Sequence, residues 1–402
     1  MEQAFRYRFF PTPEQDNLLR RTMGCVRLVY NRALAARTEA WYEKQQKIDY
    51  VETSALLTAW KKQSELDFLN EVSCVPLQQG LRHLQKAFSH FFAKRAKYPR
   101  FKKKRSGGSA EFTKSAFRWK DRQVFLAKCT EALPIRWSRP LPDGCTPSTI
   151  TVKLDASGRW FVSLLVDNPG IKPLSPSIKA IGIDAGITSL MATSDGQKTI
   201  NPKHFNRKYK RLRQAQKALS RRQKGSQNRE KARFEVARIQ ASISDARKDF
   251  LHKLTTQLVR ENQTIAVEDK AKVRNMVKNR KLARSISDAA WGELTRQLEY
   301  KAKWYGRTLV KIDRWFPSSK RCGKCGYIID KLSLKVREWT CPKCQVFHDR
   351  DLNAASNILA AGLAVLSSNA EEVCGANIRP NRHSSKGQLR NSGNRKKQKL
   401  KE

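Results

Sequence analysis

The sequence predicts an α/β protein that is divided into more than one domain. Strand-like patterns of period two occur on both sides of a long helical stretch. A segment rich in proline, glycine and serine, residues 169–178, separates two regions with different patterns and is the clearest linker. Two CxxC pairs near the C-terminus form a module of their own. The 402 residues are enough for two or three packed units.

The first region should be a β unit that is interrupted after its first strand. Residues 4–10 alternate between aromatic side chains on one face and arginines on the other. A Thr-Pro pair at 12–13 then opens a helix to about residue 42. Two more helices follow, one beginning at Thr53 or Ser54 and one over residues 76–94. Strand patterns then return at 112–119, 124–129 and 135–137, and in a hairpin of 149–155 with 159–166.

The second region mixes buried-type strands with amphipathic helices. A possible capping box at Ser285 and Asp288 precedes one of these helices. The expected strands are 180–184, 190–194, 264–268 and 308–312, and the expected helices are 206–261 with a break near 225–226, 287–305 and 352–366. The tail, residues 375–402, is polar and basic without an apolar period and is expected to be disordered.

The charge is extreme, with 81 Lys and Arg against 36 Asp and Glu, a net charge of +45. So much like charge weakens a compact state unless a polyanion neutralises it, which indicates a nucleic-acid partner. No apolar run reaches the roughly 20 residues that span a bilayer, and the first residues lack an apolar signal core. We therefore expect a cytoplasmic prokaryotic protein that acts at the nucleoid, without a membrane partner.

Three runs of basic residues are candidates for contact with phosphates. Residues 207–224 carry nine basic residues and no acid, residues 270–284 carry seven and no acid, and Lys102 to Arg105 precede a glycine pair. A single run is more often a solvated helix face, but three runs with interleaved aromatics favour RNA. The contacts expected from these runs and their surroundings are Arg100, Lys102, Lys103, Lys104, Arg105, Arg207, Lys208, Lys210, Arg211, Arg221, Arg222, Lys224, Lys278 and Arg280.

The cysteines Cys322, Cys325, Cys341 and Cys344 have the CxxC-x15-CxxC spacing of a tetrahedral zinc site. Four protein ligands leave no position for a reacting water, so the Zn²⁺ is expected to be structural. The other five of the nine cysteines show no pairing, and they are better interpreted as small buried hydrophobes or spectators.

Three acids end or begin predicted elements in an otherwise basic chain. Asp184 ends the strand AIGID, Glu268 ends TIAVE, and Asp351 lies at a helix start in HDRDLNAAS. Cleavage of phosphodiesters by two divalent metals needs carboxylates from separate elements that hold ions roughly 3.5–4 Å apart. Mg²⁺ or Mn²⁺ is the expected ion, since both favour hard oxygen ligands. Asp269, Asp288 and Asp349 are nearby acids that we place outside this set.

Each acid also has a simpler interpretation. Asp184 can be a turn residue, and Asp351 can be only the N-cap of its helix. Glu268 can form a salt bridge to Lys270 or Arg274. It is the order of strand-acid, strand-acid and helix-start-acid that favours a nuclease.

The order GIDAG, a strand ending in VE, and CxxC…CxxC running into HDRDLNAASNI resembles the nuclease of TnpB proteins, relatives of the compact type V CRISPR effectors. RRQKGS, DFLHKL, YPRFKKKR and WFPSS are similar to TnpB segments too, so the resemblance covers nearly the whole chain except the tail. It implies an RNase H-like (RuvC) nuclease domain, residues 179–316 and 347–374, in which Asp184, Glu268 and Asp351 are catalytic. A zinc-binding module, 317–346, is inserted in it. A β-barrel-like wedge domain, 1–11 and 109–168, with a helical recognition block, 12–108, should precede it.

The resemblance implies an RNA-guided DNA endonuclease of a transposon, with a noncoding guide RNA and double-stranded DNA as partners and one protein copy per RNA. Such a protein leaves the target sequence to base pairing and reads only a short adjacent DNA motif. Tyr50, Ser54, Gln78 and Thr113 stand where the family's motif readers would be. Cys74 departs from a lysine expected in a relative, so the preferred motif can differ.

Other classes of function stay open from the sequence. An RNase H-like transposase or DNA nuclease that needs no RNA would use the same acids. A nuclease-silent RNA-guided repressor would keep the acids without their geometry. A plain zinc-ribbon nucleic-acid-binding protein would leave the acids at the strand ends unexplained.

Overall fold

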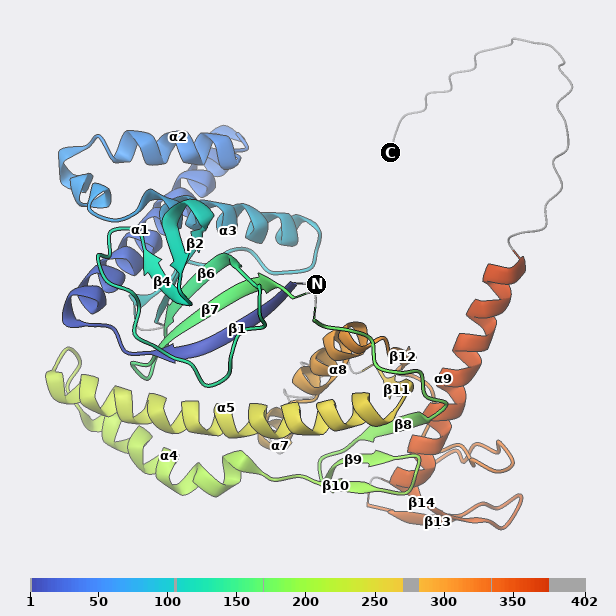
Figure 1. Ribbon diagram of the computed structural model, residues 1–402. Helices are drawn as coiled ribbons and strands as arrows, with labels where there is room; N and C mark the ends of the chain where they lie inside the picture. The colour runs from blue at the N-terminus through green and yellow to red at the C-terminus, as the bar shows by residue number, and fades with distance from the viewer. Residues whose placement is uncertain (1, 105–106, 169, 270–281, 334, 376–402) are drawn as a thin grey trace, which may run out of the picture.

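The computed structural model describes residues 2–104, 107–168, 170–269, 282–333 and 335–375. Two five-stranded sheets organise the chain into an N-terminal and a C-terminal unit (Figure 1). The long helix α5 (Gln227–Glu261) runs along both units. The expected α/β class is confirmed, with strands and helices in both regions.

The N-terminal sheet has the order β2-β6-β7-β1-β5, and all its neighbouring strands are antiparallel. Its strands are β1 (Glu2–Phe9), β2 (Gly108–Thr113), β5 (Ile135–Arg136), β6 (Pro147–Leu154) and β7 (Trp160–Asp167). A separate hairpin pairs β3 (Phe117–Lys120) with β4 (Gln123–Leu126). The expected first strand and the β6–β7 hairpin are confirmed. The pairings among described strands end at β2 and β5, so they give an open sheet and do not confirm a barrel.

A helical block follows β1. It comprises α1 (Pro13–Lys44), α2 (Tyr50–Trp60), a 3₁₀ turn η1 (Ser64–Asn70) and α3 (Cys74–Phe92). The helix α1 begins with a capping box in which Thr12 and Gln15 exchange side-chain-to-backbone hydrogen bonds. It packs on α3 and on β2, which fixes the block against the sheet. The helix α2 begins at Tyr50, slightly before the predicted start, because Asp49 caps it.

The C-terminal sheet has the order β10-β9-β8-β11-β12. Its strands are β8 (Ala180–Ala185), β9 (Ser189–Thr193), β10 (Lys198–Ile200), β11 (Thr264–Glu268) and β12 (Thr308–Ile312). The first three are antiparallel to one another, while β11 lies parallel to both β8 and β12. The carboxyl ends of β8 and β11 therefore lie at the same edge of the sheet.

Helices cover both faces of this sheet. The remaining elements are α4 (His204–Arg221), α7 (Ala283–Ala289), α8 (Trp291–Tyr305), β13 (Glu338–Thr340), β14 (Phe347–Asp349) and α9 (Arg350–Gly375). Side chains of α5, α7 and α8 pack on one face around Ile183 and Val267. The helix α9 covers the other face, where Gly182 leaves no room for a side chain, since a Cβ there would lie 2.2 Å from the Ala355 carbonyl oxygen.

The helix before β12 differs from the expectation. Ser285 and Asp288 do not form a capping box, because both lie inside α7. Ala290 has a φ of 51°, and this left-handed conformation separates helix α7 from helix α8. Asp288 instead accepts the backbone N–H of Phe205 and pairs with Arg247, so that it holds the start of α4 against α5.

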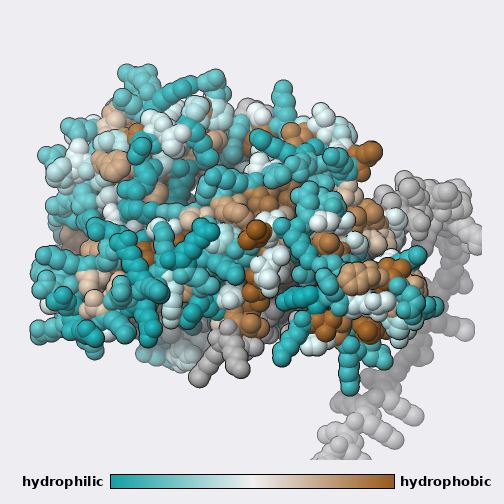
Figure 2. Space-filling model, turned by 90° about the horizontal axis from the view of Figure 1, so that it is seen from below, coloured by the Kyte–Doolittle hydropathy of each residue, from teal (hydrophilic) through white to brown (hydrophobic). Residues whose placement is uncertain are grey.

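The surface is mostly polar. Figure 2, viewed from below, shows hydrophilic side chains over much of that face, with apolar residues gathered in patches between them. Among the described helices, none is long and apolar enough to cross a bilayer.

Candidate active site and zinc centre

Two of the three candidate acids lie side by side at one edge of the C-terminal sheet. Ile183 of β8 is in register with Val267 of β11, so the next residues, Asp184 and Glu268, are neighbours on parallel strands. Because side chains alternate along a strand, Asp184 shares a face with Gly182, and Glu268 shares it with Ala266. This is the face that α9 covers, through contacts with Gly182 and Ala266.

The third acid, Asp351, lies in the first turn of α9. The start of α9 is held on the sheet by Asp349, whose carboxylate is 2.5 Å from the Lys198 ammonium on β10. Lys198 is in register with Ala192 on β9, which is in register with Asp184. Paired residues of adjacent strands point to the same face, so the first turn of α9 lies over the face that carries Asp184.

Asp349, and not Asp351, caps the helix. Its Oδ1 accepts the backbone N–H groups of Asp351 and Leu352, both at 3.0 Å. Burial opposes ionisation of Asp349, but the hydrogen bonds from Lys198 and from these amides outweigh it and lower the pKa of the carboxyl. The simpler interpretation of Asp351 as an N-cap is therefore wrong. Its carboxylate lies 3.6 Å from the Arg337 guanidinium and is about one quarter exposed.

Asp184 and Glu268 share a face of the sheet, with the first turn of α9 over it, but the three carboxylates do not form a cluster as tight as that of the cysteines. Among the described residues, the cysteines form the one cluster of three or more ligand atoms that all lie within 4.8 Å of one another. Asp184 and Glu268 both have polar interactions in the structure. The simpler pairing of Glu268 with Lys270 or Arg274 falls outside the described residues.

The zinc ligands are brought together as the spacing predicts. The sulfur atoms of Cys322, Cys325, Cys341 and Cys344 all lie within 4.8 Å of one another. Two pairs, Cys322 with Cys344 and Cys325 with Cys341, have an Sγ–Sγ distance of 3.6 Å. The short hairpin of β13 and β14 supports the second knuckle. Four converging thiols fit a tetrahedral Zn²⁺ site.

Two asparagines that sequence reasoning missed connect this zinc module to α9. Asn353 donates to the Arg321 carbonyl at 2.8 Å and accepts from the Gly323 N–H at 2.9 Å. Asn357 donates to the carbonyls of Ser318 and Arg321. Both asparagines are buried. The signal in the sequence is two amides four residues apart on an apolar helix face, because buried amides need partners.

The candidate readers of a DNA motif lie on elements that pack together. Tyr50 and Ser54 are on α2, exposed Gln78 is on α3, and Thr113 ends β2. The helix α3 contacts both α2 and β2. The Arg82 guanidinium lies 4.9 Å from the Tyr50 ring centroid, within the range of a cation–π contact.

The candidate RNA contacts differ in availability. On α4, Lys208 bonds to Ser242 and Arg211 pairs with Glu235, both of α5. The other basic residues expected to contact RNA in this part of the chain are exposed: Arg207, Lys210, Arg221, Arg222 and Lys224. Near α1, Arg100, Lys103 and Lys104 are exposed. Arg105, Lys278 and Arg280 lie outside the described residues.

Lys102 also makes contacts within the protein. Its backbone N–H and carbonyl both bond to the Asn31 side chain, and its ammonium lies 4.0 Å from the Tyr30 ring centroid. Desolvation lowers the pKa of this ammonium, although the residue as a whole is exposed. These contacts fasten Lys102 to α1, and its contact with phosphate stays a prediction.

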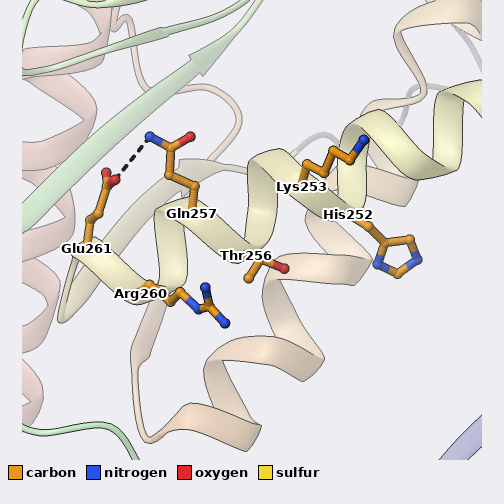
Figure 3. A pocket seen from close by; sticks show the side chains of 6 residues that line it. All are labelled: His252, Lys253, Thr256, Gln257, Arg260 and Glu261. Carbon is orange, nitrogen blue, oxygen red and sulfur yellow. Dashed lines mark hydrogen bonds between the residues drawn. The ribbon is translucent and has the colours of Figure 1, made fainter. Parts of the chain in front are cut away.

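A shallow hollow lies beside the C-terminal half of α5, and Figure 3 shows its lining. His252, Thr256 and Arg260 come from successive turns, and Gln257 bonds to Glu261 at 3.0 Å. Behind this helix lies the buried Lys301 of α8. Its ammonium donates to the His252 carbonyl and to the hydroxyls of Thr255 and Thr256.

Lys301 should make the stability of the C-terminal unit depend on pH. Burial, with a smaller effect of Arg260, lowers the pKa of Lys301 to about 8. Below that pH the lysine is charged in both the folded and the unfolded chain. Between pH 8 and its ordinary value, only the unfolded chain keeps the proton, so stability rises with pH.

We expect Lys301→Met to be more stable than the parent at pH 7.5, and to lose about 2 kcal/mol of this advantage by pH 9.5, at about 1.4 kcal/mol per pH unit above the folded pKa. Thermal unfolding of both proteins at the two pH values measures the difference. A gap between their unfolding temperatures that does not change with pH would contradict the assignment.

Three family models match parts of the chain. Residues 162–280 match the OrfB_IS605 family, described as "Probable transposase". Residues 291–358 match "Cas12f1-like, TNB domain". Residues 1–46 match "Helix-turn-helix domain", although the structure has one strand and one long helix there.

A solved Cas12f1–sgRNA–target DNA complex matches with a TM-score of 0.55 over 86% of this chain and 83% of that chain, at 15% identity. The fold and the four-cysteine module thus define an α/β protein with the fold of Cas12f1. A protein of Streptomyces pristinaespiralis named "Putative RNA-guided DNA endonuclease" is 60% identical over 96% of this chain and 94% of its own length. "Putative RNA-guided DNA endonuclease InsQ" of Escherichia coli K12 is 32% identical, with coverage of 90% and 93%. The chain belongs to the TnpB family of transposon-associated RNA-guided DNA endonucleases.

Proposed function

We propose that this RNA-guided DNA endonuclease cuts its target with Asp184, Glu268 and Asp351. The observation that carries the proposal is the register of the C-terminal sheet, with Asp184 beside Glu268 and the first turn of α9 over the same face. These oxygens suit Mg²⁺ or Mn²⁺. Divalent ions held there would activate a water and stabilise the leaving oxygen of the phosphodiester. The chain's own contribution is to bring acids from three separate elements to one edge.

The partners follow from charge and family. We infer that one protein copy carries one noncoding guide RNA, which neutralises much of the +45 charge. The protein would hold the RNA–DNA heteroduplex by its backbone, and base pairing would select the target. The N-terminal sheet, 1–11 and 109–168, would act as the wedge domain. The helices of 12–108 would form the recognition block, with Tyr50, Ser54, Gln78 and Thr113 reading the DNA motif.

The C-terminal division follows the same proposal. Residues 179–316 and 347–374 would form the nuclease domain, joined to the wedge by the linker 169–178. The module 317–346 would bind a structural Zn²⁺, which suits its four converging thiols. The predicted disorder of the tail 375–402 falls outside the described residues, apart from Gly375, which ends α9. The protein would act in the bacterial cytoplasm at the nucleoid.

The identity of the bound RNA tests guidance. Expressed with its native flanking DNA, the protein should purify with one discrete noncoding RNA that has a constant scaffold and a variable 3′ end. Sequencing of the bound RNA measures this. Because phosphate contacts dominate such binding, its affinity should also fall steeply between low and moderate salt. Heterogeneous RNA, or none, would favour a transposase or nuclease that acts on DNA alone.

A further inference from the structure

A basic hollow lies where the two units of the molecule meet. It has a volume of about 440 Å³ and lies between α1, the β6–β7 turn and α5, with Lys104, Gly107 and Gly108 completing its lining. The two units also touch at this seam. The guanidinium of Arg159, just before β7, lies 2.5 Å from the Asp245 carboxylate of α5, and a Cβ on Gly158 would lie 3.4 Å from the Phe234 ring.

The lining is cationic. Its charged side chains are Arg20, Arg21, Arg27, Lys104, Arg233 and Asp155. Asp155 is engaged by Arg159 at 2.9 Å and by the Ser157 hydroxyl at 2.6 Å. Three of the cations pair with acids outside the hollow: Arg20 with Asp16, Arg21 with Glu71 and Arg233 with Glu230. Within the described part of the chain, Arg27 and Lys104 have no ion pair and are available to an anion.

The hollow also offers a stacking surface and open backbone. Phe234 lines it, and the Arg233 guanidinium lies 4.6 Å from the centroid of that ring. Four glycines line it as well: Gly24, Gly107, Gly108 and Gly158. A ligand with a phosphate and a flat base suits cations beside an aromatic ring. The volume also lies in the range of small-ligand sites, roughly 300–1,000 Å³.

We propose that this hollow takes one unpaired nucleotide of the resident RNA, with its phosphate at Arg27 and Lys104 and its base against Phe234. RNA offers splayed, unstacked nucleotides, whereas a DNA duplex keeps its bases stacked. Phe234 is 17 residues before Leu251, which packs on the nuclease sheet, so the hollow lies about 26 Å along α5 from that contact, at 1.5 Å per residue. A nucleotide held here would tie the RNA to both units. The proposal rests on RNA guidance as the function.

Gly24 provides the test. It lies in α1, and a Cβ there would meet nothing closer than the Arg27 guanidinium at 4.0 Å, so larger side chains can enter the hollow without a backbone clash. Gly24→Ala serves as the matched control, since alanine favours the helix and leaves the hollow open. Gly24→Phe should fill it. Arg27→Gln removes an available cation without adding bulk, and keeps the test valid if Gly24→Phe does not fold.

The probe is the RNA that purifies with the parent protein, transcribed in vitro. We expect Gly24→Phe and Arg27→Gln to bind it roughly ten-fold more weakly, as loss of one stacked base or one phosphate contact implies. Hydroxyl-radical footprinting of these two variants should show that one or two adjacent nucleotides lose protection, while the rest of the footprint is unchanged. The Gly24→Ala variant should give the same affinity and footprint as the parent.

Parent-like affinity and footprint in both variants would overturn the proposal and leave RNA guidance intact. If RNA binding is unchanged but the RNA-loaded variants bind target DNA more weakly, the hollow binds DNA instead of RNA, and the proposal is equally wrong. A parent protein without a discrete RNA would instead refute guidance itself.

Discussion

Asp184→Asn should reduce DNA cleavage by more than roughly 10³-fold, while binding of the guide RNA stays within two-fold of the parent. Asparagine keeps the shape of the side chain but removes the charge that holds a divalent ion. A metal supplies several kcal/mol of transition-state stabilisation, and about 4 kcal/mol corresponds to 10³ in rate. Asp184 lies near the end of β8 beside Glu268, so the substitution removes one of two adjacent carboxylates from the proposed metal site. Plasmid cleavage by the purified RNA complex measures the effect.

The matched control is Asp249→Asn, which removes a carboxylate from the same unit. Asp249 lies on the exposed side of α5, where it pairs only with Lys253 of the next turn among the recorded ion pairs of the described residues. This variant should cut at the parent rate, because an exposed pair of this kind contributes little to stability. Full activity of Asp184→Asn, or equal losses in both variants, would contradict the catalytic assignment.

Loss of zinc should abolish cleavage although no cysteine is expected to touch DNA. A structural Zn²⁺ contributes about 10–16 kcal/mol to the folding of a small module. The knuckle around Cys322 is bonded to α9 through Asn353 and Asn357, and Asp351 precedes these residues by less than two turns. Unfolding of the module therefore releases the helix start that carries the third acid. We expect Cys341→Ser to cut at under about one hundredth of the parent rate.

Measurements other than activity separate this effect from a direct role in catalysis. Elemental analysis should find about one zinc per parent chain and a strong loss in Cys341→Ser. Limited proteolysis should then cleave within residues 317–346. Cys74→Ser is the control for zinc content and proteolysis, since Cys74 is exposed and lies outside the cluster. A variant without zinc that still cuts at the parent rate would show that the module does not position Asp351.

The acids and cysteines could be predicted from sequence because their signals are local. A buried strand that ends in an acid, and two CxxC pairs at a set spacing, are visible in a few residues each. That Asp184 and Glu268 share a face could not be predicted from the sequence, because it depends on the register of β8 and β11. These strands pair although more than eighty residues separate them in the sequence.

The contacts that the sequence did not reveal are made between distant elements. Asp349, which caps α9, also pairs with Lys198 of β10, and Asp288 of α7 accepts from the Phe205 N–H at the start of α4. Neither partner lies near in sequence. Lys102 belongs to a predicted phosphate-binding run, and its contacts with Tyr30 and Asn31 of α1 likewise depend on the fold. Composition gives the number of basic residues but does not show which of them make contacts within the folded protein.

The central claim, that an RNA directs these three acids to DNA, is tested most directly by changing the RNA. The purified protein is loaded with its own guide scaffold, carrying either of two different 3′ sequences, and each complex is given two plasmids that match one sequence or the other. We expect each complex to cut only the plasmid that matches its RNA, and Asp184→Asn to cut neither. Cleavage of both plasmids regardless of the RNA, or cleavage without RNA, would contradict the claim.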